Sequence, residues 1–253
     1  MTADFTAAGY AALLAAFRAR GYEVRGYGDA DPTRRHLLLR HDLDMSIDAA
    51  LPIAALEAEA GVKATYFVLL RTEMYNAQSA ASARALSTIA RHGHAIGLHL
   101  DASLYADEDA ALEAAAAAEC AMLERIVGRP VATISFHRPA PRLRGRPGGL
   151  AGRRHAYEPR FFAEMGYCSD SRGAWHHGHP LDHPAVAAGR ALQLLTHPIW
   201  WLTGAGGTVQ ERLDRFAHGR YQLLRAELGR NCDAYDPSRP PLAPNGDYKR
   251  PSS

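Results

Sequence analysis

The sequence predicts a single α/β domain over residues 1–230, folded as a distorted (β/α) barrel of about seven parallel strands. Strand-like and helix-like segments alternate from about residue 36 to residue 230, an order typical of parallel strands joined by crossover helices. The segments are irregular in length, which favours an incomplete barrel over an open sheet. The tail over 231–253 is rich in proline and polar residues, so we expect it to be disordered or extended.

Composition excludes several classes of protein. The chain has 253 residues, of which 47% are hydrophobic and 22% charged, and this balance excludes wholesale disorder. A net charge of +2 is too small to indicate a nucleic-acid partner. The three cysteines lie far apart with no CxxC pair, which argues against a disulfide scaffold and against a thiolate zinc site.

The sequence also carries no membrane signal. No apolar run approaches the roughly 20 residues of a membrane span. The alanine-rich N-terminus has an early acidic residue and no basic region before it, so it predicts an amphipathic helix and not a signal peptide. We therefore expect a cytoplasmic protein without a membrane partner, and the sequence does not indicate its oligomeric state.

The first half of the chain contains three predicted strands and three predicted helices. The N-terminal helix is expected over 6–20, and the apolar strand over 36–40 leads directly into two aspartates. Ser46 suits the N-cap of the next helix, which ends near Gly61. A strand rich in β-branched and aromatic residues follows over 62–70. The last elements of this half are a helix over 79–92 and a strand over 94–100.

The second half begins with a helix over 107–127, which starts with acidic residues and stops at Gly128. A strand is expected over 131–137, and the stretch 139–154, rich in proline, glycine and arginine, is expected to be a loop. The remaining predicted elements are a short helix over 159–165, strands over 167–171 and 191–196, and a final helix over 209–228.

Polar side chains collect at the carboxyl end of almost every predicted strand, where parallel α/β folds build their active sites. In chain order these residues are Asp42 and Asp44, His99 and Asp101, His137 and Arg138, Ser169 to Ser171, and Thr196 and His197. Acids and imidazoles at five strand ends predict one shared site at that end of the barrel.

The segment His41-Asp42-Leu43-Asp44 indicates a metal. Side chains alternate along a strand, so Asp42 and Asp44 face the same side. Two unpaired carboxylates on one buried face repel each other, and a divalent cation removes that cost. The same alternation places Arg40 on their face as a counter-ion and His41 on the opposite face.

Together with His99 and a third group, Asp44 makes a ligand set suited to Zn²⁺, or to Co²⁺, Ni²⁺ or Mn²⁺. A metal with an open position activates water and polarises a carbonyl. Asp42 could then accept the proton of the water, and His197 could donate one to the leaving group. This set of groups is typical of metal-assisted hydrolysis of an amide or an ester.

Six segments, in this order, resemble the polysaccharide deacetylase family (carbohydrate esterase family 4, which includes chitin and peptidoglycan deacetylases) over roughly residues 36–200. They are LLLRHDLD, GVKATYF, GHAIGLHLD, SFHRP, SDS and LLTHP. The resemblance implies a distorted (β/α) barrel with a divalent metal, usually zinc, that removes acetyl groups from sugars.

The resemblance also implies roles for individual residues. Asp42 matches the catalytic base, Asp44 and His99 match metal ligands, and His197 matches the catalytic acid. Arg138, or its neighbour His137, matches the arginine that holds the base. Asp170 falls near a later acidic motif of the family.

Two departures from the family pattern affect the metal site. Leu43 separates two acids that are usually adjacent, and Ser103 occupies the position of the usual second metal histidine. The third ligand is therefore open between His137, which we favour, and Asp101. The pattern is closer to a divergent branch with Arg-His-Asp-x-Asp at the first strand.

Four residues are candidates for substrate binding. Asp101 and Asp170 lie at strand ends, and the rings of Trp175 and Trp200 could stack on a sugar, although tryptophans are more often core residues. The arginines over 142–154 could clamp a phosphate, but a run of solvated charges is the favoured interpretation.

The leading functional prediction is therefore a metal-dependent deacetylase of an amino sugar or another small sugar-bearing metabolite. A barrel hydrolase of another C–N bond, such as a cyclic amide, is the second. A metal-free barrel that acts as a binding or scaffold module is the third.

Overall fold

The computed structural model describes residues 5–202 and 207–241, and contacts divide the chain into two compact units, Met1–Gly206 and Gly207–Ser253. This division differs from the boundary that the sequence suggested at residue 230. The final helix, α8 (Val209–Asn231), belongs to the second unit, while every strand belongs to the first.

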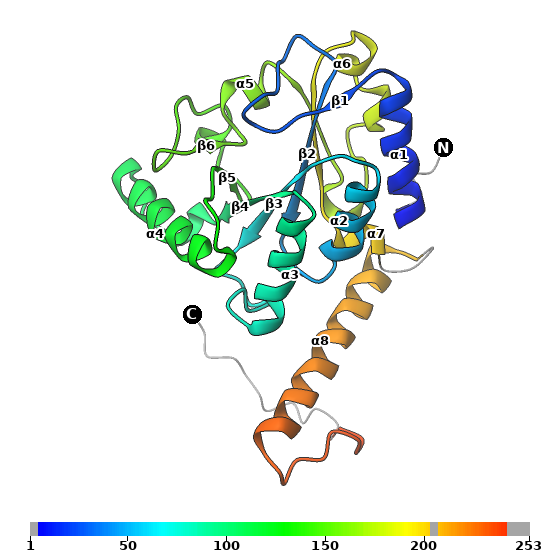
Figure 1. Ribbon diagram of the computed structural model, residues 1–253. Coiled ribbons are helices and arrows are strands. Elements are labelled where there is room, and N and C mark those ends of the chain that lie inside the picture. Colours follow the sequence, from blue (N-terminus) through cyan, green and yellow to red (C-terminus); the bar gives the residue numbers. More distant parts are fainter. Residues whose placement is uncertain (1–4, 203–206, 242–253) are drawn as a thin grey trace. The chain divides into compact units, whose positions relative to one another are not determined.

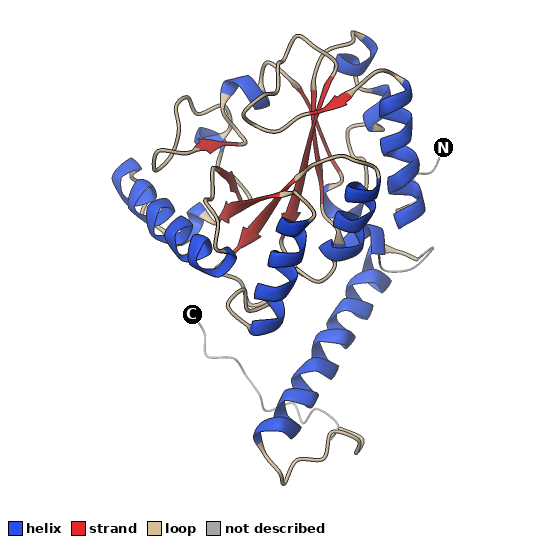
Figure 2. Cartoon of the chain, viewed as in Figure 1, coloured by secondary structure: helices blue, strands red, loops and turns tan. Residues whose placement is uncertain are grey.

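The first unit is built on a parallel sheet that curls into a half-barrel flanked by helices (Figures 1 and 2). Its strand order is β6-β5-β4-β3-β2-β8-β7, and β1 pairs with the start of β2 outside this path. All the strand pairs are parallel, so the predicted distorted barrel of about seven parallel strands is confirmed. The strands are β1 (Glu23–Val24), β2 (His36–Leu43), β3 (Thr65–Leu69), β4 (Ala95–Leu100), β5 (Thr133–Phe136), β6 (Arg154–His155), β7 (Gly166–Ser169) and β8 (Leu192–Thr196).

The helices of the first unit begin and end where the sequence has capping residues. Thr6 and Ser79 each accept a backbone N–H with the side-chain oxygen, and they cap α1 and α3. The helix α4 ends at Gly128, which has a left-handed φ of 66°. The helices are α1 (Ala7–Ala19), α2 (Ala50–Glu59), α3 (Ala80–Arg91), α4 (Asp109–Val127), α5 (Pro159–Phe162), α6 (Pro184–Ala187) and α7 (Ile199–Leu202).

One predicted cap lies in a turn before its helix. Ser46 Oγ accepts the N–H of Ala49, 3.1 Å away, and α2 begins only at Ala50. The strand β2 therefore ends in a short connection before α2, and this connection carries Asp44.

The strand β2 lies in the interior of the sheet and is buried along its whole length. Its neighbours β3 and β8 pair with it on either side, with Asp42 opposite Phe67 and His41 opposite Thr196. His41 faces the helices, as the alternation predicted: its Nε2 lies 2.8 Å from Glu57 Oε1, and its ring stacks on Tyr66. The opposite face of β2 is left for Arg40 and Asp42.

The second unit contains α8 and the segment that follows it. Thr208 and Glu211 form a reciprocal capping box at the start of α8. Beyond the helix, Arg225 Nη2 donates to the carbonyl oxygens of Pro237, 2.7 Å away, and of Arg239. Part of the predicted tail therefore contacts α8, and residues 242–253 lie outside the described residues. Within the described ranges, no helix has the length and apolar character needed to cross a bilayer.

Candidate metal centre

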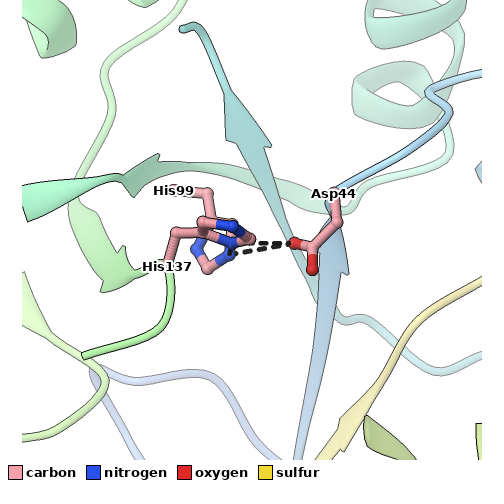
Figure 3. A group of neighbouring side chains, drawn as sticks. All are labelled: Asp44, His99 and His137. Carbon is pink, nitrogen blue, oxygen red and sulfur yellow. Dashed lines mark hydrogen bonds and ion pairs between the residues drawn. The ribbon is translucent and has the colours of Figure 1, made fainter. Parts of the chain in front are cut away.

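Three side chains converge at the carboxyl end of the sheet (Figure 3). Asp44 directly follows β2, His99 lies in β4, and His137 directly follows β5. Asp44 Oδ1 lies 3.1 Å from His99 Nε2 and 3.5 Å from His137 Nδ1, and the two nitrogens are 3.2 Å apart. Because the strands are parallel, residues from three distant parts of the sequence end at the same edge.

The spacing of these three atoms fits a divalent ion. A tetrahedral zinc with bonds of about 2.0–2.1 Å places its ligand atoms about 3.3–3.4 Å apart, close to the separations observed. Asp44 Oδ1 is buried and its charge pairs with the two imidazoles, and a cation bound by all three groups would take the place of these pairings. The structure thus groups His137, and not Asp101, with Asp44 and His99.

The other ring nitrogen of His99, Nδ1, has a hydrogen-bond partner that fixes the orientation of the ring. His99 Nδ1 lies 3.2 Å from Ser135 Oγ, and a Nδ1–H that donates to this oxygen leaves Nε2 free to bind a metal. Histidine ligands commonly have such a support, which fixes the tautomer and the orientation of the ring. The sequence did not single out Ser135, although it lies two residues before His137 and therefore on the same face of β5.

Asp42 lies beside the ligands and is held by a buried arginine. Arg40 Nε donates to Asp42 Oδ1 at 2.8 Å, and Nη2 donates to Oδ2 at 2.7 Å. Arg40 is fully buried, and its guanidinium lies over the ring of Tyr157. Burial disfavours the charged form of Asp42, but the charge and hydrogen bonds of Arg40 outweigh this effect and lower the pKa of Asp42. The carboxylate is therefore ionised at neutral pH.

Arg138 does not hold Asp42, which corrects one expectation. It is exposed, directly follows His137, and has a left-handed φ of 45°. The structure gives the role expected of Arg138 to Arg40, because Arg40 lies two residues before Asp42 on the same face of β2. This is the counter-ion that strand alternation predicted.

His197 lies on the other side of Asp44 and is oriented by Asp170. Asp170 Oδ1 accepts from His197 Nδ1 at 2.6 Å, and both carboxylate oxygens accept the backbone N–H of His197 at 3.0 Å. The indole of Trp201 donates to Asp170 Oδ2 at 2.8 Å. The free nitrogen of His197, Nε2, lies 3.8 Å from Asp44 Oδ2.

This arrangement keeps His197 protonated. Burial lowers the pKa of His197, but the negative charge of Asp170 and its hydrogen bond outweigh the effect and raise the pKa to about 9. An imidazolium whose Nδ1–H is held by a carboxylate presents its Nε2–H to the centre, as a general acid requires. Two groups of opposite protonation state, Asp42 and His197, therefore flank the same three ligands.

The four side chains that the sequence predicts to bind substrate differ in their burial and in the residues that they contact. Asp170 is fully buried and orients His197, and its contact with substrate stays a prediction. Trp200, only 4% exposed in α7, is likewise a core residue. Trp175 is half-buried and packs against Trp201, and Asp101 Oδ1 accepts the backbone N–H and the hydroxyl of Ser103.

The arginine-rich loop after β5 is fastened to α4. Arg146 Nη2 lies 3.6 Å from Asp109 Oδ1, and Arg153 Nη2 lies 2.9 Å from Glu124 Oε1. Arg142 pairs with Asp107, two residues before the same helix begins. The sequence favoured a run of solvated charges, and the structure pairs these three arginines with acidic residues.

Fold and site together define a parallel half-barrel with a candidate Asp-His-His metal centre. No known protein-family profile matches the chain, and no curated protein matches it. Similar solved structures exist, and several of them are named as CE4 or family 4 proteins.

Three of these structures illustrate the similarity. A CE4 family pseudoenzyme from Bacillus anthracis is 13% identical, with a TM-score of 0.41, over 75% of this chain and 61% of that one. The Streptococcus pyogenes deacetylase PplD, in complex with acetate, is 12% identical, with a TM-score of 0.42, over 76% of this chain and 83% of that one. A family 4 acetyl xylan esterase from Clostridium thermocellum, in complex with a cobalt ion, is 15% identical, with a TM-score of 0.36, over 64% and 73%. The chain thus spans about three fifths of the length of the pseudoenzyme.

Proposed function

We propose that the protein is a metal-dependent hydrolase that removes an N-acetyl group, or another acyl group, from an amino sugar or a sugar-bearing small metabolite. One observation carries the proposal. The three grouped ligands Asp44, His99 and His137 lie between an ionised Asp42 and a protonated His197. A base and an acid on either side of one ligand set are the groups that amide hydrolysis requires.

The residues of the site have separate roles in the proposed reaction. Asp44, His99 and His137 would hold the divalent ion, for which zinc is favoured over cobalt, nickel or manganese, and such an ion activates water and polarises the acyl carbonyl. Asp42 accepts the proton of the attacking water. His197 donates the Nε2 proton to the leaving nitrogen as the C–N bond breaks, so the products are acetate and a free amine.

The fixed partners of these two groups support their roles. Arg40 binds both oxygens of Asp42, so the carboxylate cannot rotate away from the centre. Asp170 balances the imidazolium charge of His197 and fixes the tautomer, which leaves Nε2 as the proton donor. A metal-free binding module would need neither pair, so their joint presence favours the hydrolase over that alternative.

The test is acetate release from a panel of N-acetylated sugars, with Zn²⁺ or Co²⁺ added and a cyclic amide included. Asp42→Asn should lower kcat by at least about 100-fold while the metal stays bound, because it removes the base and keeps the ligands. Ser103→Ala is the matched control, since Ser103 contacts only Asp101 in the described residues. No product from any compound, or full activity in Asp42→Asn, would contradict the proposal.

The predicted partners follow from the same proposal. The substrate is a small molecule, and the sequence predicts neither a nucleic-acid nor a membrane partner. A location in the cytoplasm also stays a prediction.

A further inference from the structure

A buried polar network lies behind β2, on the face of the strand opposite Asp42. At its middle is Glu57 of α2, which is fully enclosed. Glu57 Oε1 accepts the hydroxyl of Tyr10 at 2.5 Å and lies 2.8 Å from His41 Nε2, and Oε2 accepts the hydroxyl of Tyr66 at 2.6 Å. The proposed reaction uses none of these four side chains.

Glu57 fixes the orientation of the His41 ring. Burial raises the pKa of Glu57, but His41 and the hydrogen bonds from the two tyrosines outweigh this effect and lower it. An ionised carboxylate accepts hydrogen bonds and donates none, so His41 Nε2 carries the proton of this contact. The ring also stacks on that of Tyr66, with the centroids 4.4 Å apart. These contacts leave His41 Nδ1 for a partner on another strand.

The partner of His41 Nδ1 lies on β8. His41 Nδ1 is 2.7 Å from Thr196 Oγ1, and both residues are buried. The two residues are also opposite each other in the sheet, as the last pair between β2 and β8. The strand β8 ends at Thr196, whereas β2 continues to Leu43 beside β3. The side-chain hydrogen bond therefore joins the two strands at the point where their pairing ends.

The residues that follow this pair are the proposed base and the proposed acid. Asp42 follows His41, and His197 follows Thr196. The partners described above hold Asp42 and His197 separately and do not join one to the other. Among the described residues, the hydrogen bond of His41 to Thr196 is the one that joins side chains of β2 and β8. It therefore constrains the base and the acid relative to each other.

We propose that His41 and Thr196 are positioning residues, which set the separation and the direction of Asp42 and His197 across the centre. This inference rests on the proposed function. Each of the two residues acts through the peptide bond to its neighbour, and neither touches the substrate. The base and the acid transfer protons on two sides of one centre, so a small displacement of one strand relative to the other lowers the rate strongly.

The first measurement compares two substitutions of Thr196 by acetate release from an N-acetylated sugar that the native protein hydrolyses. Thr196→Val keeps the shape of the side chain and removes the hydroxyl, so kcat should fall by about 10-fold or more, with KM changed less than about 2-fold. Thr196→Ser keeps the hydroxyl and should restore most of kcat. Metal content per chain should stay native in both variants, because a loss of folded protein would lower metal content and kcat together. Thr133→Val is the matched control, since Thr133 is a buried threonine that begins β5, at the other end of the sheet.

His41→Phe tests the link between the strands. This substitution keeps a ring against Tyr66 and removes both nitrogens, so kcat should fall as in Thr196→Val. In the double variant His41→Phe/Thr196→Val, kcat should lie within about 2-fold of the slower single variant, because residues that act through one contact give non-additive effects. A double variant whose loss is the product of the two single losses would overturn the inference. If His41→Phe does not fold, the two Thr196 variants decide the question.

A measurement without turnover separates this inference from the proposed function. In metal-free protein with isotope-labelled histidine, NMR reports the ring nitrogens of His197. His41→Phe should shift these signals, and Thr133→Val should not. Shifted signals together with no acetate release from the native protein would support the link between the strands and contradict the proposed function. Unshifted signals in His41→Phe, or native kcat in Thr196→Val, would overturn the positioning role and leave the proposed function standing.

Discussion

Arg40 connects the proposed base to the support of a metal ligand. Its guanidinium binds both oxygens of Asp42, and its Nη2 also donates to Ser135 Oγ, the atom beside His99 Nδ1. The pair is buried, with Arg40 fully enclosed and Asp42 only 4% exposed. Such a pair is costly to break, because the remaining partner is left as an uncompensated buried charge.

Substitution of Arg40 tests this connection. Arg40→Met should destabilise the protein by about 3–5 kcal/mol, since it leaves the charge of Asp42 buried without a partner. The double variant Arg40→Met/Asp42→Asn removes both charges and should recover much of this loss. Urea unfolding of the three proteins gives the comparison. Equal stability of the single and double variants would show that the unpaired charge of Asp42 is not what destabilises the single variant.

The protonation of His197 predicts a pH dependence of stability. Its pKa is raised from 6.5 to about 9 in the folded protein, so the charge stabilises the fold fully below about pH 6.5. The contribution is lost as the pH rises through about 9. In the presence of a chelator, the free energy of unfolding of the native protein minus that of His197→Gln should decrease over this range.

The control for this prediction is a substitution of Asp170, the carboxylate that pairs with His197. Asp170→Asn removes the charge that raises the pKa of His197, so the decrease should move to lower pH in that background. A difference between the native protein and His197→Gln that stays constant from pH 6 to pH 9.5 would show that His197 is not held protonated.

Among the elements, β4 has the least room for change. Gly97 faces β3 and β5 so closely that an added Cβ would lie 2.5 Å from the ring of Phe67 and 2.9 Å from the carbonyl oxygen of Thr133. The ring of Phe67 in turn lies under the guanidinium of Arg40. Gly97 and His99 lie two residues apart, on the same face of the strand.

Gly97→Ala should therefore disturb both the sheet and the centre. We expect a loss of about 1–3 kcal/mol in the free energy of unfolding, because the neighbouring strands must move apart. Metal affinity should also fall, since β4 carries His99. Gly26→Ala is the control, because a Cβ at Gly26 meets no atom within 4 Å. Equal effects of the two substitutions would contradict the close packing of β4.

The sequence predicted most long elements and missed several of the shortest ones. The strands β2, β3, β4, β5, β7 and β8 all follow from apolar runs between turn residues. The strands β1 and β6 have two residues each, and α6 and α7 have four. Segments this short show no periodicity, and the pairing of β1 with β2 depends on the tertiary fold.

The sequence predicts those parts of the site that follow from the alternation of side chains along a strand. The shared face of Arg40, Asp42 and Asp44 follows from residue spacing alone. The contact of Asp170 with His197 joins residues 27 positions apart, and its burial depends on Trp201. The burial of Asp170 and the exposure of Arg138 were not predictable, because a strand-end position does not reveal which side chains are enclosed.

At the scale of the whole molecule, all the candidate catalytic and metal-binding residues belong to the first compact unit. The centre joins the ends of β2, β4 and β5, so a metal there would link three strands that are separated along the chain. An ion that binds only the folded state stabilises it by mass action. A bound metal would therefore stabilise the fold, and the proposed reaction depends on it.

The most direct test is the amount of divalent metal per chain, measured by elemental analysis of tag-free protein. We predict near-stoichiometric metal in the native protein after loading with zinc or cobalt. His99→Ala and His137→Ala should lose it, and Ser103→Ala should retain it. Native protein that binds no metal after loading, or a His137→Ala variant that binds as much as the native protein, would contradict the Asp44-His99-His137 centre.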